Sequence, residues 1–336
     1  MSKNTQFDNR SVFFQTEAVS GTPEAFAAAS VLYVDNFSPS YYQGDDEEIT
    51  ATCKDGGIRS SKLSKSNVYN SFSFGLPITF PTDGSGVATP GTLASWAAVL
   101  LACNLDATVN AENVVFEYSA TGEGGSGTLR DLMEYDSTQD HGYVSAGCRG
   151  NVDLTLEHNK RPRFEVSNMM GSYVTPDLAP FQAVDCSTLT DGLAENTTGP
   201  MTNEISLAGV NLCVKTVKVV NMGGATLTRD GFICAGGDQT LAEEAQTTIE
   251  IEFENTDWAE DVNGDRVEFN VFEMAESHGA INTHPFVLDT GEAGKGLRYE
   301  VTEVQATQPE MSKTVGGRKG AKLTLRCITK PVFTVY

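Results

Sequence analysis

A glycine-rich run between Val114 and Ser137 could bind a dinucleotide. Gly122-Glu123-Gly124-Gly125-Ser126-Gly127 satisfies the pattern GxGxxG, in which backbone amides cradle a pyrophosphate at the start of a helix. Such a site also needs a βαβ unit and an acidic residue about 20 positions further on. The following segment, LRDLMEYD, is too short and too weakly periodic for that helix, and position 142 is a glycine. We therefore predict no cofactor here, and interpret the run as a loop tip that joins two antiparallel strands.

Other catalytic and metal-binding patterns are absent from the sequence. There is no GxSxG or HExxH, and the histidines at positions 141, 158, 278 and 284 lack helical pairing. The seven cysteines, at positions 53, 103, 148, 186, 213, 234 and 327, show no zinc spacing and are predicted to be reduced core residues. The run that begins at Asp261 has its glycine at the fourth place rather than the sixth, which argues against a calcium loop. We predict no catalytic residue, metal or cofactor, and no enzyme.

The charge of the chain excludes a surface that grips nucleic acid. With 23 basic and 45 acidic residues, the 336-residue chain has a formal net charge of -22, and phosphate binding needs lysine and arginine to replace counterions. Repulsion of DNA would nevertheless suit a conduit through which DNA must slide without sticking. No apolar run reaches the roughly 18–20 residues of a membrane span, so we predict no membrane insertion and no secretion.

Most apolar residues recur at every second position, which predicts a mainly β, antiparallel protein. One predicted strand face consists of Val68, Phe72, Phe74, Leu76, Ile78 and Phe80, interrupted by Asn70. The turn NKRP predicts a hairpin between the strands near Leu154 and Phe164. One flanking helix is predicted in TLASWAAVLLACN, capped by Thr92. Its apolar stripe comprises Leu93, Trp96, Ala97, Leu100 and Leu101.

The chain divides into two predicted β-modules. Residues 1–175 form the first module, with an N-terminal arm, and residues 201–336 form the second, with a basic C-terminal segment. The proline-containing stretch 176–200 is the predicted linker. In the second module, Asn263-Gly264 predicts a hairpin turn between alternating segments that include DRVEFNVFEM.

Acidic residues alternate with apolar residues in TTIEIEFEN. Ile249, Ile251 and Phe253 are predicted to face the core, while the opposite side carries the acids Glu250, Glu252 and Glu254. Two interpretations of this carboxylate ladder stand at this stage: an ordinary solvated sheet face, or the wall of a pore.

The C-terminal segment has the opposite charge. From Met311 to Tyr336 there is no acid, whereas Lys313, Arg318, Lys319, Lys322, Arg326 and Lys330 are basic. The bases Arg318, Lys319 and Lys322 could pair with Asp45, Asp46, Glu47 and Glu48 of an adjacent copy and so orient self-assembly. The alternative is an ordinary strand within one chain.

Three segments together resemble the tail tube proteins (major tail proteins) of long, non-contractile tailed bacteriophages. TEAVSGTPEAFAAASVLYVDNFSPS is similar to the opening of that family, an E…GT segment that leads to a strand and a Ser-Pro turn. WAAVLLACNLDA resembles its helix, although Asn104 stands where a glycine is usual. HGYVSAGCRGNVDLTLEHNKRPRFEVSNMMGSY is similar to its strand, GxRG turn, strand, turn and final strand. The likeness is clearest from about Phe13 to Pro180 and weaker beyond.

The resemblance implies a β-sandwich or barrel subunit that self-assembles into stacked rings. These rings would form the hollow virion tail tube through which DNA passes without specific binding, assembled in the cytoplasm of the bacterial host. It implies the tape measure, tail terminator and tail-tip proteins as partners. On this reading the run from Gly122 to Gly127 is an inter-ring loop, and Glu250, Glu252 and Glu254 line the lumen. The length of the chain leaves two arrangements: a trimeric, pseudo-hexameric ring of two-module subunits, or a hexameric ring.

Two other virion functions are weighed against the tube. A receptor- or carbohydrate-binding β-sandwich would present clustered aromatics, for which Tyr33, Tyr41 and Tyr42 are the candidates. A capsid decoration protein would form a soluble ring without filaments. An enzyme is the least favoured class, because no sequence pattern predicts a pocket in which titratable groups converge.

Overall fold

The computed structural model describes most of the chain. The residues described are 10–25, 30–52, 59–83, 87–120, 124–134, 139–174, 177–180, 204–231, 238–253, 259–260, 265–267, 269–275, 282–291, 294–307, 309–313 and 319–336. Strands make up 62% of the protein and helices 6%, which confirms the mainly β, antiparallel prediction.

The first half of the chain contains ten strands and one short helix among its described residues. In chain order they are β1 (Arg10–Thr16), β2 (Val31–Leu32), β3 (Asp35–Thr52), β4 (Arg59–Pro77), α1 (Ala97–Ala102), β5 (Leu105–Val109), β6 (Val114–Tyr118), β7 (Gly127–Glu134), β8 (Gln139–Glu157), β9 (Arg163–Tyr173) and β10 (Asp177–Pro180).

The described residues of the second half contribute the remaining strands and a second short helix. These are β11 (Glu204–Leu207), β12 (Val210–Leu212), β13 (Thr216–Val220), β14 (Ala225–Gly231), β15 (Asp238–Glu244), β16 (Thr248–Phe253), β17 (Ala259–Glu260), β18 (Arg266–Val267), α3 (Val271–Ala275), β19 (His284–Thr290), β20 (Leu297–Ala306), β21 (Glu310–Lys313), β22 (Lys319–Cys327) and β23 (Val332–Val335).

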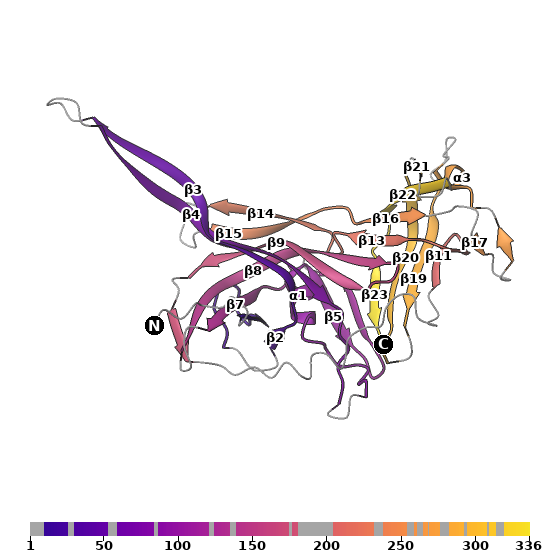
Figure 1. The fold of residues 1–336 in the computed structure, drawn as a ribbon, viewed down its shortest axis with the longest axis horizontal. Helices are drawn as coiled ribbons and strands as arrows, with labels where there is room; N and C mark the ends of the chain where they lie inside the picture. The colour runs from indigo at the N-terminus through magenta and orange to yellow at the C-terminus, as the bar shows by residue number, and fades with distance from the viewer. Residues whose placement is uncertain are drawn as a thin grey trace, which may run out of the picture.

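All of these strands except β14 and β15 belong to one 21-stranded hydrogen-bonded sheet, and those two form a separate pair. One path through the sheet runs β3, β4, β9, β8, β13, β16, β22, β21, with antiparallel pairing at every step. Figure 1 shows these strands extending across the molecule, with the β3–β4 hairpin at one side and β21 and β22 at the other. This path places the two predicted interaction segments at opposite ends of one continuous sheet.

The long strand β8 joins the halves of the chain because it changes partner along one edge. Its first part pairs with β7, from Asp140 opposite Glu134 to Cys148 opposite Gly127. Its last part pairs with β13, from Leu154 opposite Val219 to Glu157 opposite Thr216. Bulges fall on either side of Arg149 in the pairing with β9. The GxRG segment is therefore a bulged stretch inside one strand, and not the turn that the resemblance implied, because β8 continues through it.

The two predicted modules also meet at a second place, where β23 pairs with β6. One hydrophobic core contains residues from both halves, among them Phe116, Phe164, Ile251, Leu323 and Phe333. In the predicted linker, residues 177–180 form β10 and pair with β8, while 181–200 lie outside the described residues. The division into two modules stays a prediction.

The predicted hairpins and core face are confirmed in most positions. β8 and β9 pair around the NKRP turn, with Leu154 opposite Phe164, and β17 pairs with β18 across the Asn263-Gly264 segment. The side chains of Phe72, Phe74, Leu76, Ile78 and Phe80 are buried, whereas Val68 is half-buried.

The helix predictions need two corrections. α1 begins after Trp96 without a side-chain cap, so Thr92 does not cap it, and Leu93 is 43% exposed ahead of the helix. The indole N–H of Trp96 instead donates to the carbonyl of Thr79, 2.7 Å away. α3 replaces part of the strand predicted in DRVEFNVFEM, because the Asn270 side chain accepts hydrogen bonds from the next turn and favours a helix start.

The carboxylate of Glu17 ties three segments of the first half together. Its two oxygens accept hydrogen bonds from Ser126 Oγ and Thr128 Oγ1, at 2.7 and 2.8 Å, and from the amides of Gly21 and Gly147, both at 2.7 Å. The E…GT segment thus has a structural explanation: the glutamate holds the turn after β1, the start of β7 and the bulge of β8 in fixed positions.

We predict that Glu17→Gln lowers the free energy of unfolding by about 2–4 kcal/mol, because an amide turns N–H donors toward groups that are themselves donors. Urea denaturation followed by tryptophan fluorescence would measure the change. Glu24→Gln is the matched control, since the Glu24 carboxylate accepts from the exposed Ala18 amide. Equal losses in the two variants would contradict the role given to Glu17.

Candidate functional site

One face of the central strands is apolar and buried, and the other is polar. In β16, Ile249, Ile251 and Phe253 are buried, which confirms the predicted alternation, while Glu250 and Glu252 point to the opposite side. The residues that share this outer side on β8, β9, β13, β16 and β22 form the polar face. Its members include Asp153, Thr155, Glu157, Arg163, Glu165, Thr216, Lys218, Glu250, Glu252, Lys322 and Thr324. Glu254 lies outside the described residues.

Lysines on the neighbouring strands neutralise the glutamates of β16. Lys322 of β22 lies 2.9 Å from Glu250, and Lys215, just before β13, lies 3.3 Å from Glu252. The prediction of a carboxylate ladder was therefore incomplete: antiparallel pairing sets a base beside each described acid of β16. The sequence could have indicated one base on this face, because Lys218 alternates with the buried Val217 and Val219 and so lies on the polar side of its strand.

Lys218 is the most connected base of the polar face. Its ammonium lies 2.9 Å from Asp153 and 3.8 Å from Glu165, and Glu250 stands opposite it in the register. Burial opposes the charged form, but the hydrogen bond to Asp153 and the charges of the acids outweigh it and raise the pKa of Lys218. The ammonium is thus held charged and paired at neutral pH, which leaves little of its charge for a phosphate backbone.

We predict that the double variant Glu250→Gln, Glu252→Gln makes the polar face attractive to DNA, because Lys322 and Lys215 lose the glutamates that neutralise them. Fluorescence anisotropy with duplex DNA at low salt should detect a dissociation constant in the range of nonspecific binding, about 10⁻⁴–10⁻⁶ M. The control Glu112→Gln, Glu303→Gln changes the net charge equally at exposed positions elsewhere. Identical anisotropy curves for the two double variants would refute this account of the face.

The β3–β4 hairpin leaves the sheet as a two-stranded ribbon. β4 pairs with β9 only from Tyr69 to Pro77, whereas β3 and β4 stay paired out to Thr52 and Arg59. Figure 1 shows this ribbon extending past the other labelled strands. The acidic tract Asp45–Glu48 lies at the start of the ribbon, opposite Ser66–Leu63, and Lys65 lies 3.7 Å from Asp46.

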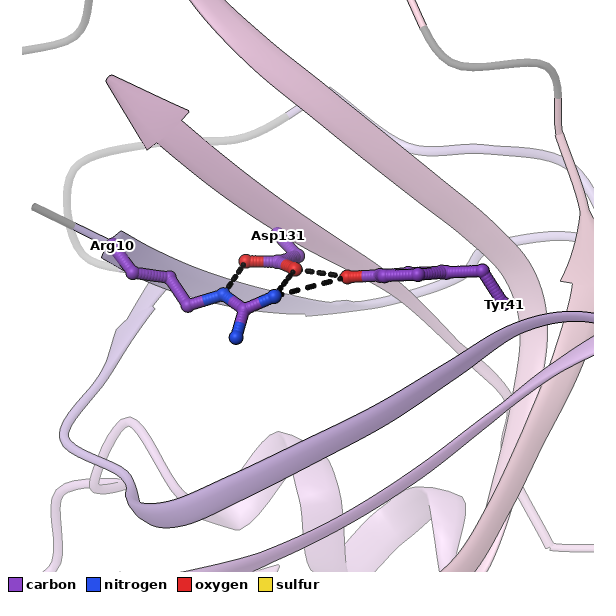
Figure 2. A network of polar contacts seen from close by, with 3 residues as sticks. All are labelled: Arg10, Tyr41 and Asp131. Atoms are coloured by element: carbon purple, nitrogen blue, oxygen red, sulfur yellow. Dashed lines mark hydrogen bonds and ion pairs between the residues drawn. The ribbon is translucent and has the colours of Figure 1, made fainter. Parts of the chain in front are cut away.

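A polar cluster fixes the root of the ribbon. Figure 2 shows Arg10 and Tyr41 meeting the carboxylate of Asp131. Arg10 donates from Nε and Nη2 to the two carboxylate oxygens at 2.7 and 2.6 Å, and the Tyr41 hydroxyl donates to the same group. Asp131 is fully buried on β7. Burial and the negative charge of Asp131 raise the pKa of Tyr41, so its hydroxyl stays a donor.

A bulge in β3 adjoins this cluster. The register of β3 on β4 shifts between Ser40 and Gln43, and Tyr42 has a positive φ of 54°. The buried Asn70, which interrupted the predicted apolar face, accepts from the Tyr42 amide at 3.0 Å and donates to Ser145 Oγ at 2.6 Å. The side chain of Asn70 thus replaces the strand pairing lost at the bulge and sets the direction of the ribbon.

We predict that Asp131→Asn lowers the free energy of unfolding by about 2–4 kcal/mol, because the partly buried Arg10 loses its counter-charge at a fully buried position. Tyr41→Phe should cost less, about 1–2 kcal/mol, since the ring keeps its stack on Tyr143 and the hydroxyl loses its hydrogen bonds to Asp131 and from Arg10. Urea denaturation measures both values. Hydrogen exchange of the β3 backbone near Tyr41 should quicken in each variant, and unchanged exchange would show that the cluster does not hold the ribbon.

The glycine-rich run is packed against the core where it is described. Ser126 is 5% exposed, the Gly125 amide donates to the Leu101 carbonyl at 3.0 Å, and a Cβ on Gly127 would lie 2.2 Å from the ring of Phe14. The flanking strands do not pair with each other: β6 pairs with β5 and β23, and β7 pairs with β1 and β8. The predicted hairpin tip is therefore wrong. Gly122 and Glu123 lie outside the described residues.

The remaining predicted site residues fall in different places. Lys322 belongs to the polar face, Lys319 begins β22, and Arg318 lies outside the described residues. The three tyrosines do not form one aromatic surface: Tyr41 is half-buried in the root cluster, Tyr42 packs edge-on against Tyr173, and Tyr33 lines a separate groove. Of the cysteines described, Cys103, Cys148 and Cys327 are buried and Cys213 is exposed, all without a disulfide.

Within the described part of the chain, no three histidine, cysteine or acidic side chains come together as a metal site. No described helix is long and apolar enough to cross a membrane. No protein-family model matches the sequence, and comparison with curated proteins finds no significant relative.

Proposed function

We propose that the protein is the structural subunit of a phage tail tube, which self-assembles into stacked rings and delivers DNA through their lumen. The observation that carries the proposal is the eight-strand path from β3 to β21. Within the described residues, β3 pairs only with β4, and β21 only with β22. Exposed strand edges are templates for further pairing, and joining them between copies into a closed ring removes them.

The size of the path favours rings of three copies. Three copies supply 24 strands, which at a spacing of about 4.8 Å and a tilt of about 40° make a barrel roughly 50 Å across between backbones. Six copies would give roughly twice that diameter, far wider than a DNA duplex needs. The trimeric ring is therefore the arrangement that we propose.

The polar face supports the same function when it is placed toward the lumen. Its bases are paired with Asp153, Glu165, Glu250 and Glu252, and the whole chain carries a net charge of -22. A wall of threonines and neutralised charges offers DNA no row of bases that would hold the backbone in place. The other tail components named by the resemblance, the tape measure, terminator and tip proteins, are the partners of such a tube.

Electron microscopy of the purified protein tests the proposal. We expect hollow filaments with a central channel and threefold rotational symmetry when the protein is concentrated at several salt levels. Monomers or closed oligomers at every concentration and salt level would contradict self-assembly into a tube. Soluble single rings would favour a capsid decoration protein instead.

A further inference from the structure

A groove lies on the edge of the polar face, beside the start of β3 at Asp35. It has a volume of about 240 Å³ and is bounded on one side by Tyr33, Asp35 and Pro77. The other side is the turn between β8 and β9, which contributes Glu157 and the segment 160–163. The groove therefore opens at the end of β3 opposite to the one that carries the acidic tract.

The lining of the groove is basic in a strongly acidic protein. It holds the three bases Lys160, Arg161 and Arg163 against the two acids Asp35 and Glu157, whereas the whole chain has a net charge of -22. Glu157 lies 2.7 Å from Lys160, and Glu165 lies 2.9 Å from Arg163. Arg161 is exposed. This balance favours a ligand that carries carboxylates, and most of the surface of a second copy carries them.

The ribbon supplies such a carboxylate segment, but not to the groove of its own copy. Asp35 pairs with Gly75, while Asp45 and Glu48 pair with Ser66 and Leu63, which lie nine and twelve residues earlier in β4. At about 3.3 Å per residue, the acidic tract stands about 30–40 Å from the groove along the strand axis. Pairing with β4 at both ends, from Asp35 to Thr52, prevents β3 from folding back, so the contact must be intermolecular.

We propose that the acidic tract Asp45–Glu48 of one copy binds in the basic groove of the next copy along the tube. This inference rests on the proposed tube function and names its ring-to-ring contact. Because donor and acceptor surfaces differ and lie at opposite ends of one strand, repetition of the contact extends a filament without closing it. The axial spacing between rings is then the separation of tract and groove projected on the tube axis, about 23–31 Å for strands tilted by about 40°.

The groove is a better partner for the tract than the basic C-terminal segment. Lys322 is half-buried beside Glu250, and its strand lies at the other end of the sheet path, whereas Lys160 and Arg161 are exposed. Arg161 and Lys160 stand on an exposed turn that a neighbouring ribbon can reach along the direction of β3. Lys319 and Lys322 of the C-terminal segment remain a competing acceptor that the experiment distinguishes.

Cross-linking between labelled copies tests the contact directly. Equal amounts of unlabelled and ¹⁵N-labelled full-length protein are mixed, assembled and treated with a zero-length carboxylate–amine coupler, and the linked peptides are identified by mass spectrometry. We expect links that join Lys160 of one isotope to an acid of the tract of the other. Links from the tract to Lys319 or Lys322 would overturn the groove as acceptor.

Charge reversal supplies the second measurement. Arg161→Glu and Asp45→Lys should each raise the protein concentration needed for sedimentable filaments about tenfold, because each places like charges together. The double variant should return to within about threefold of the unmodified protein. Lys330→Glu and Glu112→Lys are the matched controls, since they change the same charges at exposed positions outside the groove.

The outcomes separate this inference from the proposed function. Tubes with a ring spacing outside about 23–31 Å, no tract-to-Lys160 links and normal assembly of Arg161→Glu would overturn the contact and leave the tube intact. Small oligomers with tract-to-Lys160 links and charge rescue would support the contact and refute the tube. Monomers without links between isotopes would overturn both.

Discussion

The backbone hydrogen bonds of β8 hold the whole architecture together. On one edge this strand pairs with β9, and on the other it pairs first with β7 and then with β13. The switch needs local irregularity, which Gly147 supplies with its positive φ of 66° and the bulges around Arg149 supply in the register. A regular strand here would continue beside β7 and leave β13, β16 and β22 without a route into the first half of the sheet.

The electrostatic character of the polar face follows from this pairing. Placing β13 beside β8 puts Lys218 next to Asp153, and adding β16 and β22 puts Glu250 between Lys218 and Lys322. Each pair is partly exposed and contributes little to stability by itself. The effect of the arrangement is on the field above the sheet, where adjacent opposite charges cancel over a short distance. A surface can thus be rich in ions and still lack a strong local field.

Local patterns predicted the strands well and their neighbours poorly. Alternation alone identified the buried Ile249 and Ile251, because side-chain direction in a strand depends only on position along it. The neutralisation of Glu250 could not be predicted in this way, since Lys322 is remote in sequence and its place depends on register. The glycine run misled for a related reason: Gly127 is required by the nearby Phe14 ring, a contact that no local pattern encodes. In the sequence, Asn70 was recognisable only as a polar residue that interrupts an apolar strand face. Its role in replacing strand pairing depends on its hydrogen bonds with Tyr42 and Ser145.

A long strand edge creates a conflict between assembly and aggregation, and β3 combines features that address both. Its three register shifts on β4 and its run of carboxylates make it a poor template for unspecific strand addition. The same carboxylates are selective, because they favour a basic partner and repel the acidic surface that the rest of the chain presents. The root cluster adds direction, since Asp131 and Asn70 fix where the ribbon leaves the sheet. The β3 edge disfavours most contacts, and its direction relative to the sheet is fixed. It can therefore join copies of the protein in a single geometry.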